Sequence, residues 1–246
     1  MAADATTRRA AGRADSAEQA GAAKRVAVLA GASGLVGALL LPRLLAAPEY
    51  ARVIALTRRP LGVSAAHLVE RPAQFDALDA VLAEAVPVGT VFDVFCCLGT
   101  TIAAAGSQAA FAAVDRDAVV ALGRWAAAHG ARRMLVVTAV GADPASRVFY
   151  NRIKGEAEAA LRALPLAALT VLRPSLLDGA RRQFRPAESI ALAVSRPLRR
   201  WLPAGMRPVR AADVAATLLA AARSDSPSAV IASAQMHGAA DRDRSA

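Results

Sequence analysis

The chain contains a tyrosine and a lysine whose spacing suits acid–base chemistry, Tyr150 and Lys154. In an expected helix over residues 149–164, positions i and i+4 share a face, so the phenol and the ammonium can meet. A phenol ionises near pH ~10 and is a poor acid or base at neutral pH until a cation favours its phenolate. Lysine supplies that compact charge, although arginine makes up 28 of the 30 basic residues. The spacing predicts a catalytic pair; a chance pair on a solvated helix face is the alternative.

Glycines follow a short apolar run near the start of the chain. Residues 26–30 are expected to form a buried parallel strand, and residues 35–46 the helix after it. Gly31, Gly34 and Gly37 permit a tight turn, close approach of the backbone to a pyrophosphate, and close packing of helix on strand. Free N–H groups at the helix start favour phosphate binding. A turn that serves only packing is the alternative, but its place at the first strand–helix junction favours a nucleotide site.

The end of the second expected strand predicts which nicotinamide cofactor binds. Arg58 and Arg59 stand where an NAD-preferring site usually places Asp or Glu for the ribose 2′-hydroxyl. Arginine can instead neutralise a 2′-phosphate. The predicted cofactor is therefore NADPH (NADP+) rather than NADH. Because arginine is abundant throughout this chain, the prediction of NADPH rests more on where Arg58 and Arg59 stand, at the end of the second strand, than on their being arginines.

Two further strand ends carry polar or small residues. Gly99 lets backbone approach a ligand after the fourth expected strand. Thr138 ends the fifth, twelve residues before Tyr150, and its hydroxyl is predicted to bind a substrate carbonyl beside the phenol. Ser146 is a weaker candidate for that role. A Thr that only caps the strand end fits the pattern equally well.

Strand-like and helix-like segments alternate along the chain, which predicts an α/β fold with a doubly wound parallel sheet, Rossmann-like and in a single domain. The expected strands span residues 26–30, 52–57, 67–70, 91–98, 133–138 and 166–172. The expected helices span residues 35–46, 76–86, 107–129, 149–164 and 211–222. Residues 1–23 are expected to be a disordered leader, 24–235 the NAD(P)-binding domain with a short irregular C-terminal substrate region, and 236–246 a disordered tail.

Composition argues against nucleic acid, a membrane and a metal ion as binding partners. The net charge is +10, but the arginines are scattered and not interleaved with aromatic residues, so no nucleic-acid partner is expected. No apolar stretch is long enough for a membrane span. Cys96 and Cys97 are adjacent in an expected strand and point to opposite faces, so neither a metal site nor a disulfide is predicted. Two free cysteines in an apolar strand predict a reduced, cytoplasmic protein. The sequence leaves open whether it is a monomer or a homodimer.

With these residues assembled, the chain resembles the short-chain dehydrogenase/reductase superfamily, in its atypical NAD(P)H-binding branch. Within that branch it is similar to the family of the Tat-interacting oxidoreductase tumour suppressor and its bacterial relatives. The resemblance runs from about Lys24 to Asp213. It rests on the motifs Gly31–Gly37, Phe95–Thr101, Val114–Asp117, Gly141–Asp143, Tyr150–Glu156 and Leu172–Pro174. The Cys-Cys-Leu-Gly-Thr-Thr string is specific to the family, whereas the glycines and the Tyr/Lys pair mark the superfamily.

The resemblance implies roles for individual residues. Those implied to bind the cofactor are Gly31, Ser33, Gly34, Leu35, Val36 and Gly37 at the phosphates, Arg58 and Arg59 at the adenosine phosphate, Leu98 and Gly99 at its middle, and Leu177 and Arg185 beyond the sixth strand. Tyr150 and Lys154 are implied to be catalytic and to contact the cofactor. The chain departs from the family at Gln74, where relatives have Asp, and at Thr138, where relatives often have the first of two serines.

The predicted function is NADPH-dependent reduction of a small-molecule carbonyl substrate that the sequence does not identify. One alternative is an NADPH-binding redox sensor with little or no turnover, which a missing substrate-polarising hydroxyl favours. Another is a sugar-nucleotide epimerase or dehydratase, which uses the same Tyr/Lys pair. That activity calls for a sizeable C-terminal domain, and only about 70 residues follow Pro174.

Overall fold

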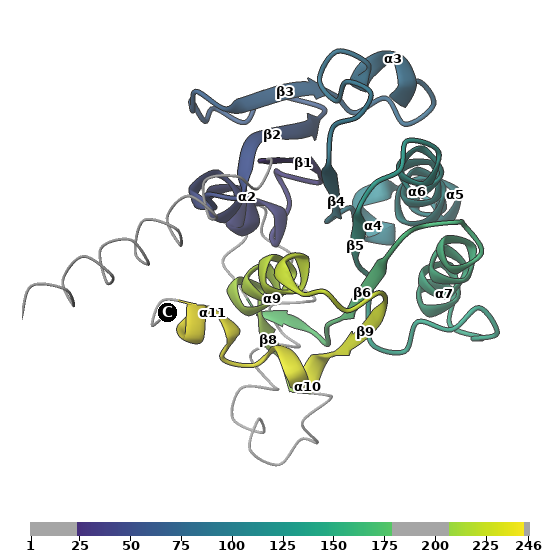
Figure 1. Ribbon diagram of the computed structural model, residues 1–246. Helices are drawn as coiled ribbons and strands as arrows, with labels where there is room; N and C mark the ends of the chain where they lie inside the picture. Colours follow the sequence, from purple (N-terminus) through teal and green to yellow (C-terminus); the bar gives the residue numbers. More distant parts are fainter. Residues whose placement is uncertain (1–23, 179–206, 244–246) are drawn as a thin grey trace, which may run out of the picture.

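Seven parallel strands form the central sheet of the computed structural model, which describes residues 24–178 and 207–243 (Figure 1). The strand order is β3-β2-β1-β4-β5-β6-β9. The chain builds β1 to β3 toward one edge and then crosses back to place β4 on the other side of β1. The order of the strands therefore reverses between β1 and β4, which is where such sheets bind ligands. The predicted α/β class, parallel sheet and single Rossmann-like domain are confirmed.

The strands of this sheet are β1 (Arg25–Ala30), β2 (Tyr50–Thr57), β3 (Leu68–Pro72), β4 (Phe92–Cys96), β5 (Arg133–Val137), β6 (Leu169–Arg173) and β9 (Ala229–Ala232). Two short strands, β7 (Leu177–Asp178) and β8 (Val209–Arg210), pair separately. The helices are α2 (Gly37–Ala46), α3 (Leu78–Leu82), α4 (Ile102–Ala105), α5 (Gln108–Ala112), α6 (Ala118–Ala128), α7 (Phe149–Arg162), α9 (Ala211–Arg223), α10 (Ser233–Met236) and α11 (Ala239–Asp243). A π-helical segment, η1 (Ala113–Asp117), joins α5 to α6.

Helices cover both faces of the sheet, which explains why its strands are continuous apolar runs (Figure 1). Ala27 and Leu29 of β1 pack into a core with α2 and α9. Val28 and Ala30 point the other way, into a core with α3, α6 and α7. The same alternation places buried Cys96 and partly buried Cys97 on opposite faces, both as free thiols. In the described residues, no helix is long and apolar enough to cross a membrane.

The structure differs from the sequence prediction in the middle of the chain. One helix was expected over residues 107–129, but the segment consists of α5, η1 and α6, because the π turn interrupts the regular hydrogen bonding. The edge strand β9 was not predicted. It has only four residues, and its side chains alternate between half-buried and exposed, so it lacks the long apolar run of a central strand.

The prediction of a disordered tail from residue 236 is wrong for the residues that the structure describes. Helix α11 folds back to helix α9, where the carboxylate of Asp213 accepts the Ala240 N–H at 3.0 Å. Arg210 forms ion pairs with both Asp213 and Asp241. The contacts of Asp213 with Ala240 and of Arg210 with Asp241 join residues far apart in the chain, so no local sequence pattern predicts them.

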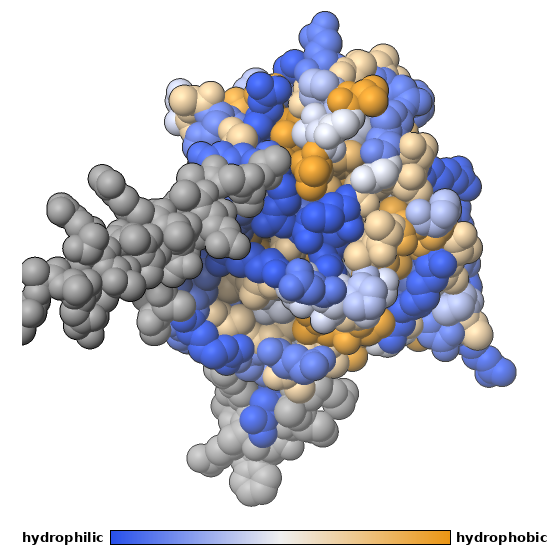
Figure 2. All heavy atoms as spheres, viewed as in Figure 1, coloured by the Kyte–Doolittle hydropathy of each residue, from blue (hydrophilic) through white to orange (hydrophobic). Residues whose placement is uncertain are grey.

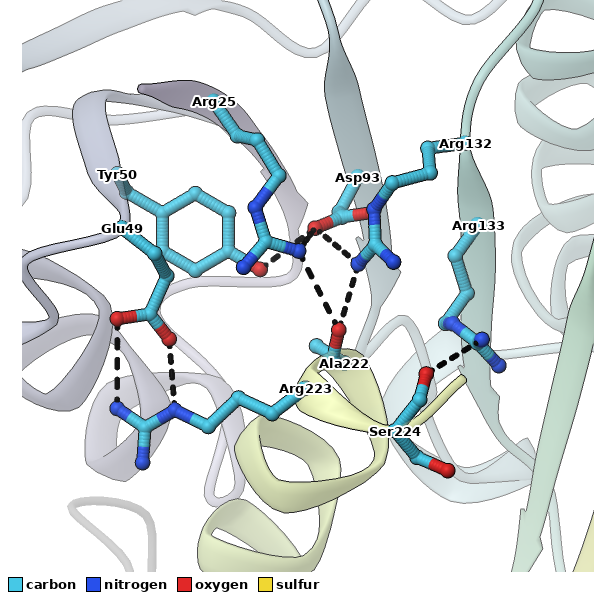
Figure 3. Close-up of polar contacts among 9 residues, drawn as sticks. All are labelled: Arg25, Glu49, Tyr50, Asp93, Arg132, Arg133, Ala222, Arg223 and Ser224. Carbon is cyan, nitrogen blue, oxygen red and sulfur yellow. Dashed lines mark hydrogen bonds and ion pairs between the residues drawn. The ribbon is translucent and has the colours of Figure 1, made fainter. Parts of the chain in front are cut away.

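A charged cluster closes the amino-terminal edge of the sheet (Figure 3). Asp93 of β4 is fully buried and accepts a hydrogen bond from the Tyr50 hydroxyl at 2.7 Å. Arg25 and Arg132 pair with the same carboxylate at 3.0 and 2.8 Å. Both arginines also donate to the Ala222 carbonyl in the last turn of α9, where positive charge is favourable. The cluster therefore ties α9 to β1 and β4.

Burial, together with Asp93, raises the pKa of Tyr50, so this phenol stays a neutral donor. In the space-filling view, hydrophilic residues gather near the centre of the face, between α2, α9 and β4 (Figure 2). The Asp93 cluster lies at the amino-terminal ends of the strands, since Arg25 begins β1, Tyr50 begins β2 and Asp93 is the second residue of β4. The chemistry predicted from the sequence lies at the opposite edge.

We expect Asp93→Asn to lower the free energy of unfolding by about 1.5–3 kcal/mol, the usual contribution of a hydrogen bond to a charged group. The substitution leaves Arg25 and Arg132 without their buried counter-charge. Urea unfolding at neutral pH measures the loss. Glu49→Gln is the matched control, because the partner of Glu49, Arg223, is half exposed and such pairs contribute about 0–1 kcal/mol. Equal losses in the two variants would contradict the special weight of Asp93.

Candidate active site

The predicted site residues come together at the carboxyl edge of the sheet. Gly31 follows β1, Arg58 follows β2, Gly99 follows β4, and Thr138 follows β5. Because all these strands are parallel and adjacent in the sheet, the residues that follow them lie along one edge. Leu177 lies in β7, which follows β6, and packs against the core shared by α2 and α9. Arg185 lies outside the described residues.

The glycine turn brings three backbone segments into contact. Gly31 has φ +85°, and a Cβ atom placed there would lie 2.5 Å from the Cys97 carbonyl oxygen after β4. A Cβ atom on Gly37 would lie 2.1 Å from the Gly31 oxygen. Any side chain at Gly31 or Gly37 would therefore clash with backbone, so packing by itself is sufficient to require glycine at both positions. Gly34 is less constrained, with 3.2 Å to the same oxygen, so it is the glycine whose surface remains available to a ligand.

The turn leads into the start of α2, which is suited to an anion. Gly34 donates its N–H to Gly31 at 2.9 Å, so the regular helix begins at Gly37, two residues later than predicted. The N-cap residue, Val36, offers no side-chain hydrogen bond, and the first turn of α2 contains no acidic residue. Ser33 is exposed and Leu35 half-buried beside this end. Helix N–H groups without side-chain caps are good phosphate ligands.

The loop after β2 presents Arg58 and Arg59 at the surface. The Arg59 N–H donates to the Thr57 hydroxyl at 3.3 Å, and the Leu61 N–H donates to Glu70 of β3 at 3.0 Å. These bonds hold the loop backbone in place. Among the residues that the structure describes, neither guanidinium forms an ion pair, so both remain available to a phosphate.

Lys154 is almost completely buried, with 3% of its surface exposed. Its Nζ forms an ion pair with Asp115 Oδ1 at 2.7 Å. A Cβ atom on Gly99 would lie 3.8 Å from the Nζ, so the ammonium lies against the loop after β4. Burial alone lowers the pKa of Lys154, but Asp115 and Tyr150 oppose this and the net pKa is raised. The lysine is therefore held as a cation inside the protein.

Sequence reasoning did not assign Asp115 a role, although it stands in one of the motifs that carry the resemblance. The carboxylate is 1% exposed, and its second oxygen accepts the Thr100 N–H at 2.9 Å. Asp115 is followed by two more charged residues, Arg116 and Asp117, so the sequence alone gives no signal that Asp115 is the one that is buried.

Tyr150 lies one turn before Lys154 in the first turn of α7, and 36% of its surface is exposed. Its ring packs at 5.6 Å, centroid to centroid, on Phe111 of α5. Phe111 also contacts Phe149 at 5.7 Å. This aromatic cluster orients the phenol at the surface, while the electrostatic influence of Tyr150 reaches the buried ammonium of Lys154.

The Thr138 hydroxyl has another partner than the one predicted. It donates to Glu158 Oε1 of α7 at 2.7 Å, and the residue is buried. Glu158 also accepts Arg173 at 2.6 Å and Arg162 at 2.8 Å. Since a hydroxyl has one proton, this geometry argues against Thr138 as the donor to a substrate carbonyl. The Ser146 hydroxyl accepts the Val148 N–H at 3.2 Å, and because it is the acceptor in this bond, the bond does not use its own proton.

Gly155, directly after Lys154, is a second residue that sequence reasoning missed. A Cβ atom there would lie 2.1 Å from the Asp143 carbonyl carbon. The loop after β5 therefore contacts the backbone of α7, and the Asp143 N–H donates to the Asn151 carbonyl at 3.1 Å. A glycine in the interior of a helix was the signal that could have revealed this close approach.

Comparison with known proteins agrees with this arrangement of turn, sheet and helix. Residues 31–225 match the family described as NAD(P)H-binding. The chain belongs to this family. It is 32% identical over 168 residues to protein fmp52, mitochondrial, of Emericella nidulans, which covers 66% of this chain and 71% of that protein. It is 36% identical over 165 residues to protein HTATIP2 of Rattus norvegicus, covering 65% and 66%. The resemblance to the Tat-interacting family is confirmed.

Solved structures share the fold at low sequence identity. MoeE5 in complex with UDP-glucose and NAD superposes with a TM-score of 0.61 and 19% identity, over 83% of this chain and 74% of MoeE5. A UDP-glucose 4-epimerase from Thermotoga maritima gives a TM-score of 0.61 at 16% identity, over 84% and 76%. At these identities the comparison establishes the Rossmann-like architecture alone.

We expect Glu158→Gln to weaken the protein at neutral pH and to flatten its acid unfolding curve. Burial raises the pKa of Glu158, but the bonds from Arg173, Thr138 and Arg162 outweigh it, and the net pKa is lowered. A lowered folded-state pKa stabilises the protein above the unfolded value of about 4.3, and this contribution disappears as the pH falls through the folded value. Urea unfolding between pH 7 and pH 3 should show the parent and variant converging; a constant difference would contradict the assignment.

Proposed function

We propose that this protein is an NADPH-dependent oxidoreductase that transfers hydride to the carbonyl carbon of a small molecule. The observation that carries the proposal is the buried Lys154 ammonium, which lies against Gly99 one helical turn from Tyr150. The same edge of the sheet holds the glycine turn and the start of α2. A cation, a phenol and a phosphate-binding turn in one place are the parts that such a reaction requires.

The residues present fit a dinucleotide with a 2′-phosphate. Ser33, Gly34, Leu35 and Val36 would hold the pyrophosphate at the start of α2, and Arg58 and Arg59 would hold the 2′-phosphate. Leu98 and Gly99 would line the middle of the cofactor. When bound, the nicotinamide supplies the hydride. The chain supplies the orientation and the proton.

In the proposed reaction, the Tyr150 hydroxyl donates its proton to the carbonyl oxygen as negative charge develops there. The exposed position of the phenol leaves it accessible to a substrate. Lys154 favours the phenolate that remains, because an opposite charge stabilises the ionised form. General-acid assistance of this kind typically contributes about 10²–10⁴ in rate. With the Thr138 hydroxyl bonded to Glu158, Tyr150 is the proposed donor to the carbonyl oxygen.

The engagement of Thr138 also favours a second candidate, a redox sensor that binds NADPH and turns over slowly or not at all. The two functions share every cofactor contact and differ only in turnover. Two 4-epimerases among the structural neighbours share the fold at 16% and 12% identity, and that likeness does not by itself support epimerase activity here.

We also propose a cytoplasmic location, as the unpaired thiols of Cys96 and Cys97 suit a reducing compartment. The fungal relatives carry the word mitochondrial in their names. Fractionation of the source cells distinguishes the two compartments.

The proposed cofactor preference predicts that the parent binds NADPH more tightly than NADH. Arg58→Ala combined with Arg59→Ala should remove most of that preference, because the 2′-phosphate loses both counter-charges. Calorimetry with each cofactor measures the four affinities. Arg124→Ala is the control, since Arg124 lies on α6 away from this loop. Equal affinities of the parent for both cofactors would contradict the proposal.

The proposed proton transfer predicts that Tyr150→Phe loses at least about 10²-fold in turnover with NADPH binding retained, because only one hydroxyl is removed. Lys154→Met should move the pH–rate profile to higher pH, since the phenol loses the cation that favours ionisation. A screen of carbonyl compounds for NADPH oxidation provides the assay. Full activity of Tyr150→Phe would disprove the catalytic assignment. Tight NADPH binding without turnover of any carbonyl would favour the sensor.

A further inference from the structure

The carboxylate of Asp115 makes two contacts that join separate parts of the candidate site. One oxygen pairs with Lys154 Nζ on α7 at 2.7 Å. The other accepts the Thr100 N–H, in the loop after β4, at 2.9 Å. Asp115 is 1% exposed and Lys154 3%, so the pair is removed from solvent. Such a pair is maintained only when its geometry is good, because each charge is costly to bury alone.

We propose that Asp115 is the positioning residue of this site, holding the Lys154 ammonium against the Gly99 backbone and fixing the loop after β4 through Thr100. Its effect on turnover rests on the function proposed above. Its effect on the lysine and on cofactor binding can be measured without turnover. Asp115 acts through Lys154 and Thr100 and has no assigned contact with substrate.

The ion pair of Asp115 and Lys154 lies beside the backbone of Gly99. A Cβ atom there would lie 3.6 Å from Asp115 Oδ1 and 3.8 Å from Lys154 Nζ. The ion pair therefore lies directly beside the backbone that is predicted to line the middle of the cofactor. A cofactor that contacts Gly99 would meet a lysine whose place is already set by Asp115.

The π-helical segment η1 provides the geometry that this contact needs. Insertion of a π turn displaces side chains from their regular helical positions, and such turns occur often at functional sites. Here the segment makes two ion pairs with α7. Asp115 pairs with Lys154 inside the protein, and Arg116 pairs with Glu156 at 2.9 Å nearer the surface. These contacts hold α7 against η1 on both sides of Gly155.

Three titratable groups from three elements influence the Lys154 ammonium: Asp115 of η1, Tyr150 of α7 and Cys96 of β4. Burial raises the pKa of the Cys96 thiol to about 11, so it is neutral at physiological pH. Asp115 is the only one of the three whose ordinary form at neutral pH is an anion. Without it, the largest effect that opposes burial is lost, and the pKa of Lys154 falls.

The chain allows a direct test because Lys24 and Lys154 are its only lysines. Lysine labelled with ¹³C at the ε carbon gives two NMR signals, and Lys24→Arg assigns them, since Lys24 is exposed. In the full-length parent, Lys154 should titrate above the ordinary lysine value of about 10.4. A folded parent in which Lys154 titrates below that value would overturn the proposal without any further variant.

Asp115→Asn keeps the shape and an acceptor for Thr100 but removes the charge. Its Lys154 signal should titrate at lower pH than in the parent. Asp117→Asn is the matched control on the same π turn, because Asp117 is exposed and pairs only with Arg116 among the described residues. It should leave the Lys154 titration unchanged. An unchanged titration in Asp115→Asn, or equal shifts in both variants, would overturn the proposal.

Calorimetry then tests whether the lysine is positioned for the cofactor. Asp115→Asn should weaken NADPH binding by about tenfold or more, the weight of one hydrogen bond to a charged group. Asp117→Asn should bind as the parent does. A shifted lysine titration with unchanged NADPH affinity would overturn the positioning role. Both expected results together with no carbonyl turnover would refute the oxidoreductase proposal and leave the role of Asp115 intact.

Discussion

The buried charge of Lys154 is the constraint around which the carboxyl edge of the sheet is built. An ammonium with 3% of its residue surface exposed needs a counter-charge, and Asp115 supplies it at 2.7 Å. Asp115 stands in a π-helical segment, and the pair lies beside the Gly99 backbone, where a Cβ atom would be 3.6 Å from Asp115 Oδ1 and 3.8 Å from Lys154 Nζ. Gly155 then lets the loop after β5 contact α7. Several backbone irregularities thus accompany one buried cation.

The two edges of the sheet deal with buried charge in different ways. At the amino-terminal edge, Asp93 is surrounded by Tyr50, Arg25 and Arg132, and the arginines also satisfy the last turn of α9. The charged groups of that cluster are paired with one another, and their contacts hold α9 against β1 and β4. At the carboxyl edge, the start of α2 and the guanidinium groups of the β2 loop retain donors suited to an anion. The fold therefore separates a stabilising edge from an edge suited to binding.

Membership of the NAD(P)H-binding family agrees with the local chemistry and leaves the reaction to be determined from the site. Within the glycine turn, Gly31 and Gly37 are needed for packing, whereas Gly34 is exposed and less constrained. Thr138 shows the opposite case. A residue in a position suited to substrate binding instead completes a buried network with Glu158 and Arg173, which joins β5, α7 and β6.

Local patterns in the sequence were sufficient to predict the α/β class, the six strands from β1 to β6, the glycine turn and the shared helix face of Tyr150 and Lys154. Each depends on residues that are close in the chain, through strand hydrophobicity or helical period. Only the tertiary structure decided the partner of Lys154, the partner of Thr138, the edge strand β9 and the packing of α11 on α9. These depend on contacts between distant residues, such as Asp115 with Lys154 or Arg210 with Asp241. A charge or hydroxyl in a sequence has many potential partners, and the folded backbone selects one of them.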